Sequence, residues 1–285
     1  MSGPTIFIPT AGKRRLVGVA INEDYGEPSA DLRGALADRD TLTARAERRD
    51  CDSIEFIING DADKQNGGEL FAKAEAYTQG NDDLMVAWSG HGALGDDGRA
   101  LLVCAGALKA PSFAKACISG KEFRQFAGRL RAGARTVAWI DTCHADGARS
   151  LINPHGVYNK PRFLAHPDPA QAALSAALAS VNYDSAGGGA FSHFGRTHTD
   201  RGLIIDELLW DVFLAACGLK QTSADTFIKG KFCGAFTTLM DEAEKALATT
   251  ATLVEVVAGA TRLLEEGGYS QRPVPDGSAY HLARP

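Results

Sequence analysis

The 285-residue sequence lacks a long apolar segment, a cluster of basic residues and any closely spaced pair of cysteines. A membrane-spanning helix needs about 18 or more consecutive apolar residues, and no run approaches that length. Residues 1–13 lack a positively charged start followed by an apolar stretch, so they do not resemble a secretory signal. We therefore expect a protein of the cytoplasm with no membrane partner.

Charge and cysteine usage exclude further classes. Thirty Lys and Arg residues stand against 35 Asp and Glu, and the net charge of −5 comes without a basic cluster, which argues against a nucleic-acid partner. The six cysteines form no Cys-x-x-Cys pair, so we expect free thiols. With 45% hydrophobic residues and no internal repeat, the chain is expected to fold as a single domain over residues 1–285.

Apolar β-type runs alternate with helical patterns in the first half of the chain, which predicts an α/β fold with a mostly parallel, doubly wound sheet. Strands are expected at Arg14–Ile21, Ser53–Asn59, Asp83–Trp88 and Thr136–Cys143, and helices at about Ala30–Arg48, Gly68–Tyr77 and Lys121–Arg131.

The second half of the chain gives weaker patterns. Residues 92–98 and 147–170 are predicted as loops, residues 100–105 as a short strand, Gln171–Val181 as a strand with a helix as the alternative, and Leu203–Cys217 as a helix. Helices that open near Gly234 and Thr250 and a short strand near Tyr280 complete the prediction.

Two of the predicted strands end in side chains capable of nucleophilic chemistry. Ser-Gly-His-Gly at 89–92 follows one apolar run, and Asp-Thr-Cys-His-Ala at 141–145 closes another. The carboxyl ends of neighbouring parallel strands meet at one edge of an open α/β sheet, where ligands bind. Cys143 is therefore a candidate nucleophile with His91 as its partner.

These two motifs resemble the Ser-Gly-His-Gly and Asp-Ser-Cys-His-Ser/Ala-Gly motifs of metacaspases and their bacterial caspase-like relatives. The resemblance extends to Asp38 in Leu32–Asp38, to Gly-Ala-Phe-Thr at 234–237 and to Gln-Arg-Pro at 271–273. It implies a caspase-like three-layer α/β/α sandwich. It also implies a large-subunit portion over about 1–165 and a small-subunit portion over about 170–285, with an insertion at 182–233.

The chemistry that the resemblance implies is cysteine endopeptidase activity. A thiol is only slightly ionised at neutral pH, so Cys143 needs a partner such as His91, whose imidazole changes charge near pH 7. Cys143 would attack the scissile carbonyl and His91 would protonate the leaving amine. The backbone N–H groups of Gly92 and Cys143 would form the oxyanion hole.

The sequence also predicts which peptide bond is cut. Asp141 lies two residues before Cys143 and Ser89 two residues before His91, so each shares a strand face with its catalytic neighbour. The resemblance adds Asp38 beside them. Two carboxylates and a hydroxyl suit a guanidinium, which predicts protein or peptide substrates cut after Arg or Lys, with Arg favoured.

Several alternatives stay open. The domain could be a catalytically silent interaction module, or a peptidase with a different preference for the residue before the cut. A third alternative is a metal site of His91, Cys143 and His144, but the chain lacks the close ligand pairs typical of structural zinc. Many metacaspases bind an activating calcium, but Ile118–Glu122 lacks the paired aspartates expected for it and Ser150 stands where a further aspartate would follow the Cys, so we expect neither a metal nor another cofactor. Activation is expected from a cut after a basic residue in 147–170 or 182–233, made by the enzyme itself or by an upstream protease.

Overall fold

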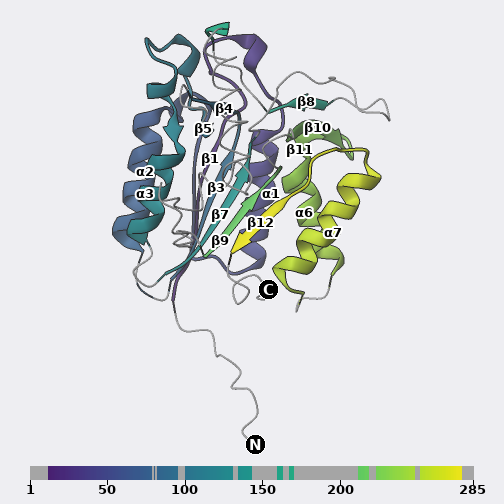
Figure 1. Cartoon of the computed structure of the whole chain (residues 1–285). Helices are drawn as coiled ribbons and strands as arrows, with labels where there is room; N and C mark the ends of the chain where they lie inside the picture. Colours follow the sequence, from purple (N-terminus) through teal and green to yellow (C-terminus); the bar gives the residue numbers. More distant parts are fainter. Residues whose placement is uncertain are drawn as a thin grey trace, which may run out of the picture.

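The computed structural model describes residues 12–78, 80, 82–95, 100–130, 134–142, 159–162, 167–169, 211–217, 223–247 and 251–277. Its centre is a six-stranded sheet with the strand order β12-β9-β7-β3-β1-β2 (Figure 1). The first five strands along the chain are parallel and β12 is antiparallel to β9. The strands of this sheet are β1 (Arg14–Ala20), β2 (Ser53–Ile58), β3 (Asp83–Ser89), β7 (Arg135–Asp141), β9 (Val212–Ala215) and β12 (Val274–Gly277).

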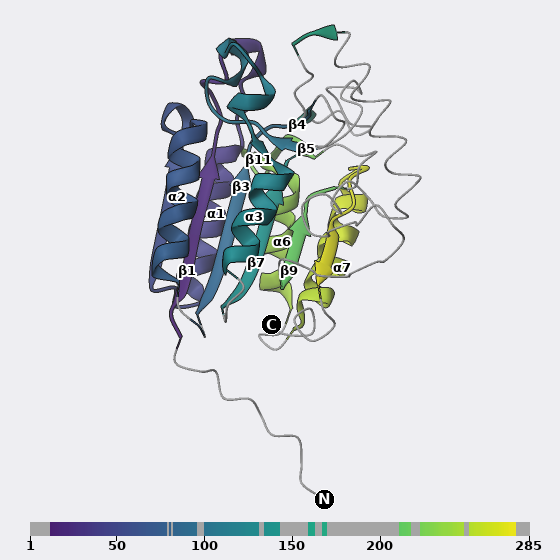
Figure 2. The same ribbon diagram turned by 60° about the vertical axis from the view of Figure 1, so that its left-hand side comes forward.

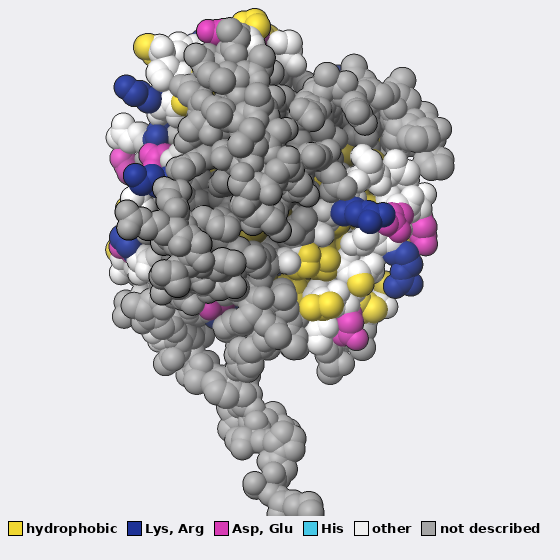
Figure 3. Space-filling view, viewed as in Figure 1, with side chains coloured by type: hydrophobic (Ala, Val, Ile, Leu, Met, Phe, Trp, Pro, Cys, Tyr) yellow, Lys and Arg dark blue, Asp and Glu magenta, His cyan; other side chains and the backbone are white. Residues whose placement is uncertain are grey.

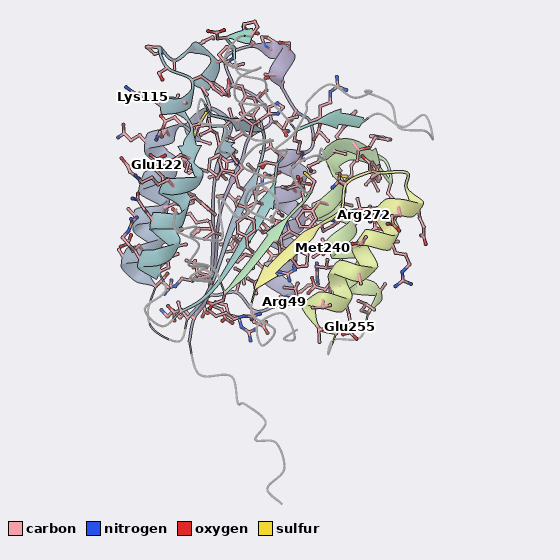
Figure 4. All side chains as sticks on the ribbon, viewed as in Figure 1. Arg49, Lys115, Glu122, Met240, Glu255 and Arg272 are labelled. Atoms are coloured by element: carbon pink, nitrogen blue, oxygen red, sulfur yellow. The ribbon has the colours of Figure 1, made fainter. Side chains whose placement is uncertain are left out.

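Helices cover both faces of the sheet, which confirms the predicted three-layer α/β/α sandwich (Figures 1 and 2). On one face lie α2 (Lys64–Tyr77) and α3 (Gly120–Leu130), whose Phe71 and Phe126 rings stack 4.7 Å apart. On the other face lie α1 (Ala35–Arg48), α6 (Ala235–Ala246) and α7 (Leu253–Glu266). Met240 of α6, labelled in Figure 4, is buried in the core on this second face.

The central strands are apolar because both of their faces are covered. Trp88 of β3 packs in the core under α2 and α3, whereas Trp139 of β7 packs in the core under α1 and α6. The Trp139 ring lies 5.1 Å from that of Phe236, and its Nε1–H donates to Thr237 Oγ1 over 3.1 Å. Large buried side chains thus lie one residue before the polar end of β3 and two residues before that of β7.

Charged side chains join α1 to α6. Arg45 Nε donates to Glu244 Oε2 over 2.6 Å, and Arg49, labelled in Figure 4, pairs with the other oxygen of the same carboxylate. Thr252 and Glu255 form a capping box before α7, so the helix begins at Leu253, three residues later than predicted. On the face seen in Figure 3, basic and acidic side chains lie close to one another.

Two small antiparallel sheets stand at the carboxyl ends of the central strands (Figure 1). One contains β4 (Gly92–Leu94), β5 (Ala100–Leu102) and β6 (Ile118–Ser119). The other has the order β11-β10-β8 and contains β8 (Asn159–Pro161), β10 (Ala224–Ile228) and β11 (Lys231–Gly234). Short 3-10 helices span Pro28–Ala30, Asn59–Asp61, Ala107–Lys109 and Ala114–Ala116.

The structure corrects several predicted elements. The helix predicted at Leu203–Cys217 is wrong over Val212–Ala215, where four consecutive buried residues form β9; an apolar run this short has no periodicity that separates strand from helix. Parts of the predicted loops 92–98 and 147–170 form β4 and β8, because they find antiparallel partners elsewhere in the chain.

The predicted insertion at 182–233 includes β9, β10 and most of β11, so these residues belong to the sheets of the fold. The strand predicted at Gln171–Val181 lies outside the described residues. None of the described helices combines the length and the apolar character that crossing a membrane requires.

Candidate active site

A cluster of buried polar side chains, which we call the pocket, lies at the carboxyl ends of two neighbouring strands. Ser89 ends β3, Asp141 ends β7, and the parallel register places the two residues directly opposite each other. Both side chains are buried. Adjacent residues of paired strands point to the same face, so the strand ends bring together a hydroxyl and a carboxylate, as the alternation along each strand predicts.

Asp38 reaches this pocket from the first turn of α1. Its carboxylate is fully buried, with Ser89 Oγ donating to Oδ2 over 2.6 Å and the backbone N–H of Gly234 donating to Oδ1 over 2.7 Å. Burial is the largest influence on its pKa and raises it to about 7, against the lowering effect of the nearby Arg162. Asp38 therefore joins α1, β3 and the start of α6 at one point.

Asp141 is held by three donors from the second half of the chain. Ser223 Oγ donates to Oδ1 over 2.6 Å, while Thr237 donates to Oδ2 through its hydroxyl over 2.8 Å and its backbone N–H over 3.2 Å. Thr237 is the last residue of the Gly-Ala-Phe-Thr motif, so the structure gives that residue the role of fixing a pocket carboxylate.

Position 234, next to the carboxylates of the pocket, requires a glycine. A side chain at Gly234 would place its Cβ against the carboxylates of Asp38 and Asp141 and 2.9 Å from Nη2 of Arg162. The close approach of this backbone is what lets its N–H donate to Asp38.

A third carboxylate, Asp225 of β10, completes the cluster and was not identified from the sequence. Its two oxygens accept the backbone N–H groups of Arg33 and Gly34 at 2.9 and 2.8 Å, just before α1. The sequence holds only a weak signal for it, a polar residue in the alternating stretch 223–228, because its partners lie about 190 residues away in the chain.

The guanidinium of Arg162 fills the space between the three carboxylates. Its Nη2 lies 2.7 Å from Asp38 and 3.2 Å from Asp225, and its Nη1 lies 3.5 Å from Asp141 Oδ1. Nη1 also donates to Ser89 Oγ over 2.7 Å and to the backbone oxygen of Asp141 over 3.2 Å. The side chain is completely buried. Although burial lowers its pKa, the surrounding Asp141, Asp38 and Asp225 carboxylates raise it well above the usual value.

His91 follows β3 and is buried beside Tyr25, with the two ring centroids 4.7 Å apart. Its Nε2 lies 2.6 Å from the backbone oxygen of Ala30. A carbonyl oxygen only accepts hydrogen bonds, so Nε2 carries the proton in this contact. In the neutral ring Nδ1 is then the basic nitrogen. Cys143 and His144 lie outside the described residues.

The backbone N–H of Gly92, the predicted oxyanion donor, is directed at a peptide carbonyl. It donates to the backbone oxygen of Arg162 over 2.9 Å. The residue whose side chain fills the acidic pocket thus also presents its own carbonyl to the glycine beside His91.

The other five cysteines all lie among the described residues. All five are free thiols, and four of them are buried. Burial raises the pKa of Cys51 and Cys104, of Cys117 to about 12 and of Cys233 to about 11, so these thiols are poor nucleophiles at neutral pH. Among the described residues, no three His, Cys, Asp or Glu side chains are grouped in a way that could hold a metal ion.

Comparison with known proteins agrees with the fold. The family model of the caspase domain matches residues 15–280. Protein GSU0716 from Geobacter sulfurreducens is 16% identical, with a TM-score of 0.63 over 95% of this chain and 96% of that chain. Caspase-1 from Spodoptera frugiperda is 10% identical, with a TM-score of 0.55 over 94% of this chain and 89% of that chain. No curated protein matches. Caspase domains are generally those of cysteine peptidases, and this chain belongs to the caspase-domain family.

Proposed function

We propose that this protein is a cysteine endopeptidase in which Cys143 and His91 form the catalytic dyad and which cuts peptide bonds after Arg or Lys. The observation that carries the proposal is the buried cluster of Asp38, Asp141 and Asp225 around a single guanidinium. Buried carboxylates of this number require a cation, because an uncompensated buried charge is costly. A pocket of this kind selects a basic side chain.

The same charges exclude an acidic side chain from the pocket. A substrate Asp would bring a further carboxylate among three that are already buried, and like charges placed side by side at an interface cost several kcal/mol. Caspases that cut after Asp need basic groups in this pocket, whereas the only basic group among the described pocket residues is Arg162 itself.

The geometry favours Arg over Lys. The two terminal nitrogens of the guanidinium share four partners: Nη1 contacts Ser89 and the backbone oxygen of Asp141, and Nη2 contacts Asp38 and Asp225. A planar fork can meet all of them at once, whereas the single ammonium of Lys is a point charge with three donors. Lys is therefore accepted with a lower kcat/KM.

His91 and Gly92 are supported in their roles by their surroundings. The contact from His91 Nε2 to the Ala30 carbonyl leaves Nδ1 as the basic nitrogen of the neutral ring, ready to take a proton from the Cys143 thiol and later to protonate the leaving amine. The Gly92 N–H already binds a peptide carbonyl, which is what an oxyanion donor does.

Cleavage of a peptide library by wild type, Cys143→Ala and Cys51→Ala tests the proposal. Cys51→Ala is the matched control, because it removes a half-exposed thiol between α1 and β2. We expect hydrolysis after Arg, weaker hydrolysis after Lys, complete loss in Cys143→Ala and unchanged rates in Cys51→Ala. Hydrolysis that survives in Cys143→Ala, or that follows Asp residues, would contradict the assignment.

A second function, a catalytically silent interaction module, is favoured by one observation: the Arg162 side chain is completely buried among the three carboxylates. This reading expects equal inertness of wild type, Cys143→Ala and Arg162→Ala towards every peptide. Hydrolysis by Arg162→Ala would exclude it.

A further inference from the structure

Arg162 makes backbone contacts that a purely structural arginine does not need. Its carbonyl oxygen accepts from Gly92 N–H over 2.9 Å, and its own N–H donates to the backbone oxygen of Ser223 over 3.1 Å. Arg162 is therefore held at three points: its side chain, its backbone N–H and its backbone carbonyl. Charge compensation of the carboxylates by an arginine would require only the guanidinium.

The residues before Arg162 are held in the manner of a bound peptide. Residues 159–161 form β8, which adds to the edge of β10 with the antiparallel register Pro161↔Ala224, Lys160↔Asp225 and Asn159↔Thr226. Strand addition to an exposed sheet edge, with a side chain entering a pocket, is a general mode of peptide recognition. The strand ends at the residue whose carbonyl reaches the Gly92 N–H.

We propose that Asn159–Arg162 is an internal substrate bound in the active site of its own chain, and that Arg162–Phe163 is the peptide bond that the enzyme cuts in itself. Until the cut, the segment blocks the pocket against external substrates. This inference rests on the proposed peptidase function and adds to it the processing site and the means of inhibition.

The cut needs only water as co-reactant. The Cys143 thiolate forms a bond to the carbonyl carbon of Arg162, and the carbon–nitrogen bond to Phe163 breaks while His91 gives its proton to the departing amine. Water then adds to the thioester carbon with one proton passing to His91, and the carbon–sulfur bond breaks to release the Cys143 thiolate. The products are a carboxylate on Arg162, a free amine on Phe163 and the regenerated Cys143.

Tethering explains why the intact chain is inhibited. The segment is connected on both sides, to β7 through residues 142–158 and to β9 through residues 163–211, so its effective concentration at the pocket is of the order of millimolar or more. External peptides must compete with it. After the cut one connection is gone, and Arg162 can leave the pocket and be replaced by a substrate.

Four variants separate the cut from the inhibition. Arg162→Ala removes the pocket side chain, Phe163→Pro replaces the residue after the bond by one without an N–H while every described pocket contact stays, Cys143→Ala removes the nucleophile, and Arg149→Ala is the matched control at another Arg of the 147–170 range. Intact mass and amino-terminal sequencing identify the cut, and kcat/KM on a short Arg peptide measures access to the pocket.

We expect wild type and Arg149→Ala to yield a fragment that begins at Phe163, and the other three variants to stay whole. Uncut Arg162→Ala should hydrolyse the peptide at least about tenfold faster than uncut Phe163→Pro, because only in Phe163→Pro does the tethered arginine still compete. Since Arg162→Ala leaves the carboxylates without their cation and could fail to fold, Phe163→Pro alone also decides the question: it should be inert where cut wild type is active.

The two proposals fail in different ways. A wild type that hydrolyses Arg peptides but stays whole, or that is cut only at another residue, overturns this inference and leaves the peptidase function standing. Phe163→Pro with the activity of cut wild type overturns the inhibition. Inert wild type together with inert, folded Arg162→Ala overturns the peptidase function and this inference with it.

Discussion

Neutralising Asp141 without changing its shape tests the acidic pocket directly. In Asp141→Asn the amide occupies the same volume, but the negative charge is gone. In the wild-type chain the Ser223 and Thr237 hydroxyls each donate to one carboxylate oxygen, and the amide replaces one of these two acceptors by a donor. The substitution should be introduced into the Arg162→Ala variant, which serves as the parent enzyme, because no internal guanidinium competes there with the substrate.

The size of the effect follows from the contact of Asp141 with the guanidinium. At an effective dielectric constant of about 20, unit charges at the 3.5 Å between Asp141 Oδ1 and Arg162 Nη1 attract by about 5 kcal/mol. Desolvation offsets part of this, and truncating one member of a buried charge pair costs about 2–5 kcal/mol. The kcat/KM for an Arg peptide should therefore fall by about 30-fold to several thousandfold.

The assay measures two quantities: the kcat/KM for an Arg peptide and the rate at which Cys143 is alkylated. Asp141→Asn should lose Arg hydrolysis while the rate of Cys143 alkylation stays near that of the parent, and Asp61→Asn, the same change at an exposed carboxylate, should leave both unchanged. A folded Asp141→Asn enzyme with full Arg hydrolysis would refute the pocket assignment. Equal loss of alkylation would show that Asp141 acts on the thiol instead of on the substrate.

Three further predictions concern Asp38, Gly234 and the effect of removing metal ions. Burial raises the pKa of Asp38 from 3.8 to about 7, so its contribution to folding stability is full below about pH 4 and is lost as the pH rises through 7; Asp38→Asn should remove this part of the pH dependence of thermal unfolding, and a parent curve without it would contradict the expectation. Gly234→Ala should lower the free energy of unfolding by about 1–3 kcal/mol in denaturant titrations because its Cβ meets the pocket carboxylates, whereas Gly68→Ala, with open space around it in α2, should be neutral or stabilising. Chelators should leave Cys143-dependent hydrolysis unchanged, and a large stimulation by calcium would show this to be wrong.

The parts of the fold that the sequence predicts are those with long, local patterns. β1, β2, β3 and β7 are runs of six or seven mostly apolar residues, and their predicted bounds are correct to within two residues. β9 has only four residues, and β8 becomes a strand only through its pairing with β10, so no local pattern identifies either of them.

The residues of the candidate site also divide into those that the sequence predicts and those that it does not. Ser89 and Asp141 follow from strand alternation, and Asp38 from a family motif, so their common pocket could be predicted before the structure. Asp225 could not, because the contacts that make it a pocket residue join positions 33 and 34 to position 225. Arg162 could not either, because nothing in the local sequence separates it from the other basic residues of the range 147–170.

The position of β9 in the sheet has a consequence for any chain cut between β7 and β9. β9 lies between β7 and β12, and its four residues are fully buried. The two pieces would therefore share one continuous sheet and one core, and neither piece alone could cover the edge of its central strands. A nick in this region would create a two-chain protein that stays together on dilution. Residues 1–162 and 163–285 expressed as separate polypeptides should complement each other, and neither should be soluble without the other.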